Sequence, residues 1–120
     1  MARILIADDD RQLVELLRAT LDEAGHEVVG THSGLAAVGL IEREDFDLIV
    51  LDVLMPGMSG DAVADLLDQL KPGLPVLLIT GDSGDQFVQT AHLPLLRKPF
   101  AGQELVQAVD ELLEPSSKRD

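Results

Sequence analysis

The sequence predicts an α/β domain in which a parallel five-stranded sheet lies between two layers of helices. Short apolar segments alternate along the chain with segments whose apolar residues recur at helical spacing, the pattern of repeated strand–helix units. Two of the apolar segments, 47–51 and 74–80, are nearly continuous hydrophobic runs, as expected for strands buried on both faces. At 120 residues, the chain has the length of one such domain.

The composition restricts the classes of function. The sequence is 46% hydrophobic, contains no Cys, Trp or Tyr, and has a formal net charge of −13. Such acidity disfavours nucleic acid and anionic membranes as direct partners. The absence of Cys excludes disulfides, thiol nucleophiles and thiolate metal sites. Neither a transmembrane run nor a signal peptide is evident, so we expect a cytoplasmic protein.

The first half of the chain contains three of the predicted strands. Asp10 is a suitable N-cap for the first helix, Gly25 ends that helix, and Ser33 is suited to cap the second. The mixed polarity of the second strand indicates an edge position. The apolar face of the first helix is expected to comprise Leu13, Leu16, Leu17, Thr20, Leu21 and Ala24. The predicted ranges are 3–7, 26–31 and 47–51 for strands, and 11–24 and 33–43 for helices.

The second half continues the alternation, with two strands and three helices. Ser59 is suited to cap the third helix. The fourth helix is expected to be short or irregular because its apolar pattern is sparse. The predicted strands are 74–80 and 93–98, and the helices are 59–70, 85–91 and 102–113. The domain is therefore expected to span 1–114, followed by a polar tail over 115–120.

Chemically reactive side chains follow four of the predicted strands. Asp8 and Asp9 follow the first strand, Asp52 the third, Thr80 ends the fourth, and Lys98 ends the fifth. Right-handed crossovers place all carboxyl ends of parallel strands at one rim of the sheet, where open α/β sheets bind ligands. Singly, each residue has an ordinary interpretation as a cap, a turn former or a strand end. Their shared rim is what predicts a functional site.

These residue types suit metal-assisted phosphoryl transfer. Crowded carboxylates repel one another, and a hard divalent cation with oxygen ligands, Mg²⁺ above all, relieves that repulsion. An ionised Asp52 is then available as a nucleophile that forms an aspartyl-phosphate. Lys98 provides a positive charge against phosphoryl oxygens, and Thr80 provides a hydroxyl donor. The three histidines show no metal-ligand spacing and are expected to face solvent; they are His26, His32 and His92.

At these residues the sequence resembles the receiver domains of two-component response regulators (the CheY-like superfamily). The similarity covers residues 3–113, and its motifs are ILIADDD over 4–10, MPGMSG over 55–60 after Asp52, Thr80-Gly81, and Lys98-Pro99-Phe100. The resemblance implies a single flavodoxin-like (βα)5 three-layer sandwich with strand order 2-1-3-4-5.

The resemblance also implies roles for individual residues. Asp52 corresponds to the phosphoacceptor, Asp9 to the direct Mg²⁺ ligand and Asp8 to its acidic partner, with the Leu54 backbone carbonyl as a further ligand. Mn²⁺ or Ca²⁺ is expected to substitute for Mg²⁺. Thr80 and Lys98 correspond to the hydroxyl and the amine that contact the phosphoryl group, and the Lys98–Pro99 peptide is expected to be cis. The implied phosphoryl donor is a histidine kinase or a histidine phosphotransfer protein.

Two features depart from the family pattern. The position three residues before Lys98, usually aromatic, is Leu95, and only 18 positions separate Thr80 from Lys98. Both changes affect the face that many receivers use to dimerise or to signal. Together with the segment LPLLRKPF over 93–100, they are similar to receivers attached to hybrid histidine kinases. A covalently attached kinase or a separate downstream effector is therefore a further expected partner.

Two alternative functions remain open at the level of sequence. A Mg²⁺-dependent phosphohydrolase of the aspartyl-phosphate type needs a second acid two residues after its nucleophile, where this chain has Leu54. A degenerate receiver would bind a partner without being phosphorylated. That interpretation is disfavoured by the intact Asp9, Asp52, Thr80 and Lys98. It is favoured by Leu95 and by the short fourth helix. A phosphoacceptor and switch, not a turnover enzyme, is the function that the sequence predicts.

Overall fold

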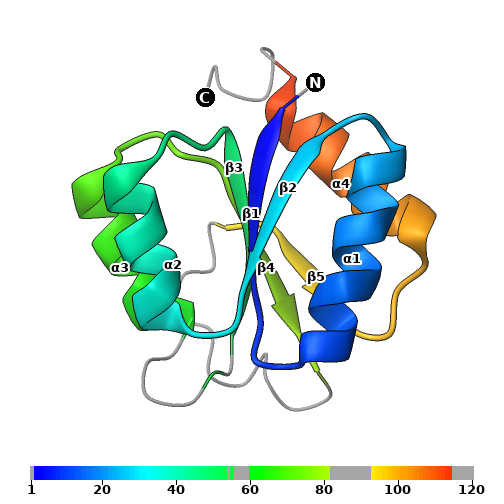
Figure 1. The fold of residues 1–120 in the computed structure, drawn as a ribbon, viewed down its shortest axis with the longest axis horizontal. Coiled ribbons are helices and arrows are strands. Elements are labelled where there is room, and N and C mark those ends of the chain that lie inside the picture. The colour runs from blue at the N-terminus through cyan, green and yellow to red at the C-terminus, as the bar shows by residue number, and fades with distance from the viewer. Residues whose placement is uncertain (1, 54, 56–59, 82–92, 115–120) are drawn as a thin grey trace.

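The protein is a three-layer α/β structure built on a parallel five-stranded sheet (Figure 1). The computed structural model describes residues 2–53, 55, 60–81 and 93–114. The strand order is β2-β1-β3-β4-β5, which confirms the predicted flavodoxin-like arrangement and places β2 at an edge. The strands are β1 (Arg3–Ala7), β2 (Glu27–Thr31), β3 (Leu48–Asp52), β4 (Val76–Thr80) and β5 (Leu95–Arg97).

Helices cover both faces of the sheet. In Figure 1, α2 and α3 lie on one side and α1 and α4 on the other. The helices are α1 (Arg11–Glu23), α2 (Gly34–Arg43), α3 (Gly60–Leu70) and α4 (Gly102–Leu113). The helix labelled α4 is therefore the one that the sequence predicts over 102–113. Several predicted features lie outside the described residues. They are the short helix over 85–91, the Ser59 cap, Leu54, His92 and the tail over 115–120. None of the described helices combines the length and the apolar character that a membrane span requires.

Side-chain alternation along the strands divides the core into two halves. Leu5 and Ala7 of β1 pack in the half that includes α2 and α3, whereas Ile4 and Ile6 pack in the half that includes α1 and α4. The same alternation holds in β3, where Leu51 belongs to the first half and the residues on either side of Ile49 to the second. All five residues of β3 are buried, as its continuous apolar run predicts.

The capping predictions for the first two helices are confirmed. The Asp10 side chain accepts a hydrogen bond from the Leu13 N–H at 3.1 Å, and the Ser33 side chain accepts one from the Ala36 N–H at 3.1 Å. Gly25 follows α1 with a φ of +97°, a conformation that glycine adopts at little steric cost. The start of α1 is therefore fixed directly after the carboxyl end of β1.

Several expectations for exposure were wrong. Leu16 is 63% exposed, because the inward face of α1 is centred on Val14, Leu17 and Leu21. Ala24, which was expected on the same face, is the C-cap that follows α1 and is also exposed. The His26 side chain is only 9% exposed, so it does not face solvent. Its Nδ1 accepts the Ala2 N–H at 3.1 Å, which ties the α1–β2 turn to the chain just before β1.

Candidate functional site

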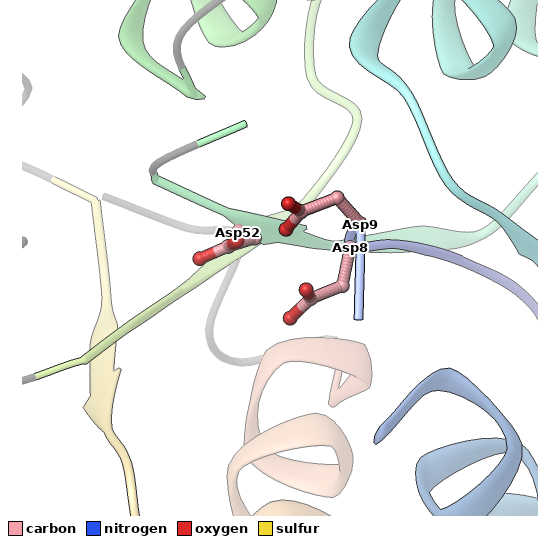
Figure 2. A group of neighbouring side chains, drawn as sticks. All are labelled: Asp8, Asp9 and Asp52. Carbon is pink, nitrogen blue, oxygen red and sulfur yellow. The ribbon is translucent and has the colours of Figure 1, made fainter. Parts of the chain in front are cut away.

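Three aspartates meet at the carboxyl ends of β1 and β3. Asp8 and Asp9 follow β1, Asp52 is the last residue of β3, and the pairing of Ala7 with Leu51 sets these two strand ends side by side. One carboxylate oxygen from each aspartate lies within 4.8 Å of the other two (Figure 2). The structure therefore confirms that these three carboxylates converge on one rim.

The alternation of the strands decides where each carboxylate points. By parity, Asp8 continues the face of Ile4 and Ile6, which packs with α1 and α4, while Asp9 continues the opposite face. Figure 2 shows the Asp8 and Asp9 side chains leaving the end of β1 on opposite sides, with Asp52 beside them. Asp8 is fully buried and Asp52 is 4% exposed, whereas Asp9 is open to solvent. The group thus combines two buried carboxylates with one accessible carboxylate.

Asp8 is held at both carboxylate oxygens. Its Oδ1 accepts the backbone N–H of Asp10 at 2.9 Å, and its Oδ2 accepts a hydrogen bond from Lys98 Nζ at 3.0 Å. Buried carboxylates require such partners because an unpaired buried charge is strongly unfavourable. The first contact comes from the start of α1 and the second from the segment after β5. Two distant parts of the chain therefore fix one side chain.

Lys98 bridges two of the aspartates. Its Nζ lies 3.0 Å from Asp8 Oδ2 and 3.7 Å from Asp52 Oδ1. Partial burial acts to lower the pKa of Lys98, but the hydrogen bond that its amine donates to Asp8 and the charges of Asp8, Asp52 and Asp10 outweigh it, so the pKa is raised. The amine is therefore positively charged at neutral pH and offsets part of the negative charge of the site.

Thr80 occupies the same rim on the neighbouring strand. The register pairs Asp52 with Ile79, so Thr80 lies one residue beyond the partner of Asp52. Thr80 is fully buried, and its hydroxyl donates to the Gly81 carbonyl at 3.3 Å. Its own carbonyl accepts the Lys98 N–H at 2.7 Å, which joins the ends of β4 and β5. The Lys98–Pro99 peptide is cis, as expected.

Leu95, at the position that the family resemblance indicates as usually aromatic, is 37% exposed on β5. The expectation for one neighbour of Asp8 was wrong. His32, expected to face solvent, is half-buried, and its Nδ1 lies 3.3 Å from the Asp8 carbonyl oxygen. The only sequence signal for this contact is that His32 directly follows β2, the strand parallel to β1.

The three carboxylates fit a hard divalent cation. They supply oxygen donors only, which suit Mg²⁺, and the spacing of up to 4.8 Å is close to the roughly 4 Å between opposite ligands of an octahedral Mg²⁺ site. Among the described residues, Asp8, Asp9 and Asp52 are the acids whose oxygens lie closely enough together to share one cation. Lys98 already pairs with Asp8 and Asp52, which leaves the exposed Asp9 as the most accessible carboxylate for an incoming cation.

Asp9→Asn should raise the melting temperature of the metal-free protein. The substitution removes one negative charge from a group of three, and the expected increase is roughly 3–5 °C if the repulsion costs about 1 kcal/mol. Thermal unfolding monitored by circular dichroism in EDTA provides the measurement. Asp68→Asn, on an exposed position of α3, changes the net charge equally and should have no such effect. An unchanged or lower melting temperature in Asp9→Asn would show that the carboxylates are not mutually destabilising.

Comparisons with known proteins agree with this geometry. The family model "Response regulator receiver domain" matches residues 4–110. The response regulator FleR of Pseudomonas aeruginosa is 38% identical over 112 residues, covering 90% of this chain but only 24% of FleR. The response regulator receiver protein CpdR of Brucella abortus is 31% identical over 117 residues, covering 94% of this chain and 98% of CpdR.

The fold and the site also resemble a solved receiver structure. The response regulator TrrA of Thermotoga maritima, in complex with Mg²⁺-BeF, is 32% identical with a TM-score of 0.86, covering 94% of this chain and 100% of TrrA. The chain spans about a quarter of FleR and nearly all of CpdR. The family match over most of the chain, the sheet order and the aspartate group lead to one conclusion: the chain belongs to the response regulator receiver domain family, a family of phosphoacceptor domains.

Proposed function

We propose that Asp52 is the phosphoacceptor of this receiver domain. The observation that carries the proposal is the position of its carboxylate, 4% exposed at the end of the central strand and between Lys98 and the acids after β1. An Asp52 carboxylate oxygen attacks the phosphorus of a phosphohistidine on a histidine kinase or a phosphotransfer protein. The new O–P bond forms as the N–P bond breaks, and the leaving histidine nitrogen takes up a proton.

The neighbouring side chains have distinct proposed roles. Asp8 and Asp9 hold Mg²⁺, together with Asp52 and the backbone carbonyl of Leu54, which lies outside the described residues. When bound, the cation neutralises charge on the incoming phosphoryl group. Mn²⁺ or Ca²⁺ would substitute, since both accept oxygen ligands.

On the other side of Asp52, the Lys98 amine pairs with a phosphoryl oxygen in place of its contact with Asp52. Thr80 donates its hydroxyl to another such oxygen, giving up the bond to the Gly81 carbonyl. The domain is a phosphoacceptor and not a turnover enzyme, since its product is the modified Asp52 itself. The negative charge added on phosphorylation is thus met by an amine, a hydroxyl and a cation.

Incubation with acetyl phosphate and Mg²⁺ should add one phosphoryl group to the protein. Intact-mass measurement should show a single acid-labile adduct, and EDTA should suppress it because the carboxylate site then lacks its cation. Beryllofluoride with Mg²⁺ should in parallel shift the amide resonances of residues at the rim. A protein that gains no adduct and shows no spectral change would instead be a phosphorylation-independent interaction module. Sustained release of phosphate over many turnovers would indicate a phosphohydrolase.

The partners are proposed at the level of class. The relatives FleR and CpdR are described as response regulators, which favours a donor histidine kinase and a separate output over attachment to a hybrid kinase. The hybrid-kinase alternative is supported by three sequence features, which are the segment 93–100, Leu95 and the short spacing between Thr80 and Lys98. We further assign the receiver to residues 1–114 and a tail to 115–120. A phosphotransfer assay with purified kinases, scored by transfer of label to the chain, would identify the donor.

A further inference from the structure

The backbone carbonyl of Asp8 has an unusual partner for a residue at the end of a strand. The Asp8 N–H donates to the Thr31 carbonyl at 3.2 Å and so extends the pairing of β1 with β2 by one bond. Beyond that point the Asp8 carbonyl faces a side chain, His32 Nδ1, at 3.3 Å. A carbonyl oxygen can only accept, so Nδ1 is the donor and carries the hydrogen. The imidazole therefore takes the place of the next backbone donor at this end of the sheet.

The position of that carbonyl matters for the neighbouring residue. The Asp8 carbonyl belongs to the rigid peptide plane that leads directly into Asp9. The Asp8 side chain is already fixed by the Asp10 N–H and by Lys98, whereas Asp9 is exposed and takes its direction from the backbone. A hydrogen bond to the carbonyl restricts rotation of this plane. It therefore restricts where the Asp9 carboxylate is presented.

We propose that His32 is a positioning residue for the cation site. Its Nδ1–H bond to the Asp8 carbonyl orients the peptide that carries Asp9 toward Asp52, so the site is organised before a cation binds. The inference rests on the proposed metal-dependent phosphoacceptor function. It requires neither contact between His32 and the cation nor any charge on the imidazole ring. Preorganised ligands bind metal more tightly because less ordering accompanies binding.

Three variants separate this role from general stability. His32→Ala removes the donor. His32→Asn keeps one, because the Asn amide nitrogen stands close to the position of the histidine Nδ1. Ser33→Ala is the matched control, since it removes the cap of α2 and weakens the same loop without touching the Asp8 carbonyl.

Mg²⁺ affinity is measured by isothermal titration calorimetry at pH 8.5, where free imidazole is neutral, and melting temperature is measured separately. His32→Ala should weaken Mg²⁺ binding by about three- to tenfold, the range that corresponds to the net free energy of one hydrogen bond. His32→Asn should stay within about twofold of the parent chain. Ser33→Ala should lower the melting temperature and leave the Mg²⁺ affinity unchanged.

The outcomes distinguish the inference from the function beneath it. If the parent chain does not bind Mg²⁺, the proposed metal-dependent function fails. If the parent chain binds Mg²⁺ and His32→Ala binds it equally well, the function stands and the positioning role is wrong. Equal loss of affinity in His32→Ala and Ser33→Ala would also overturn it, because loop stability would then explain both. Rescue in His32→Asn, with a protonated Nδ1 seen by nitrogen NMR in the parent chain, would support it.

Discussion

Asp52→Asn should abolish the phosphoryl adduct completely while leaving the fold intact. The amide has nearly the shape of the carboxylate, so the buried end of β3 need not rearrange. A neutral amide is a poor nucleophile, so the variant lacks the oxygen that is proposed to accept the phosphoryl group. Intact mass after incubation with acetyl phosphate and Mg²⁺ should equal that of the untreated variant. Circular dichroism should show unchanged secondary structure.

Asp10→Asn is the matched control for this experiment. Asp10 lies at the same end of the sheet and carries the same charge, but it serves as the N-cap of α1. Asn is an equally good N-cap, so the fold should be preserved. The Asp10→Asn protein should therefore accept a phosphoryl group at close to the rate of the parent chain. An adduct that persisted in Asp52→Asn would place the phosphoacceptor on a different residue and overturn the assignment.

Lys98→Met should destabilise the protein strongly. The substitution leaves Asp8 fully buried and Asp52 nearly so, without the amine that now lies 3.0 Å and 3.7 Å from their oxygens. Removing one partner of a buried ion pair costs about 3–5 kcal/mol, and the partial exposure of Lys98 brings the expected loss to roughly 2–3 kcal/mol. Urea unfolding measures the free energy of unfolding directly. A change below about 0.5 kcal/mol would mean that Lys98 contributes no more than a surface ion pair.

A second substitution tests the cause of this loss. Lys98→Met combined with Asp8→Asn removes the buried charge as well as its partner, and should recover part of the lost stability. Mg²⁺ should also stabilise Lys98→Met more than it stabilises the parent chain, because a bound cation then supplies the missing positive charge. If neither change restores stability, the loss comes from packing of the lysine stem and not from charge.

The pH dependence of the parent chain follows from the raised pKa of Lys98. A group whose pKa is higher in the folded state contributes stability that is fully present below its unfolded pKa, about 10.4 for lysine. That contribution is lost only as pH rises through the folded value. The difference in unfolding free energy between the parent chain and Lys98→Met should therefore stay constant from pH 6 to 9, as far as the lysine determines it. Above about pH 10 it should shrink.

The sequence by itself determined the fold class, because its strongest signals are local. The apolar runs at β3 and β4 have the length and continuity of strands buried on both faces, and the Asp10 and Ser33 caps mark where helices begin. The rule that parallel strands end at one rim was sufficient to group Asp8, Asp9 and Asp52. Helix faces were less certain, since the i, i+3 and i, i+4 pattern fits two adjacent stripes of α1 and the sequence favoured one containing Leu16.

Only the tertiary structure decided which aspartates of the site contact Lys98 and which one is exposed to solvent. The two-residue repeat of a strand is known from sequence, but which face meets α4 and Lys98 depends on how the layers pack. That packing sends Asp8 and Asp52 to Lys98 and leaves Asp9 exposed. The contact of His32 with Asp8 joins residues 24 positions apart across neighbouring strands. Such contacts depend on strand register, which local periodicity does not encode. The sequence therefore predicted a solvent-facing His32, although the residue contacts the site.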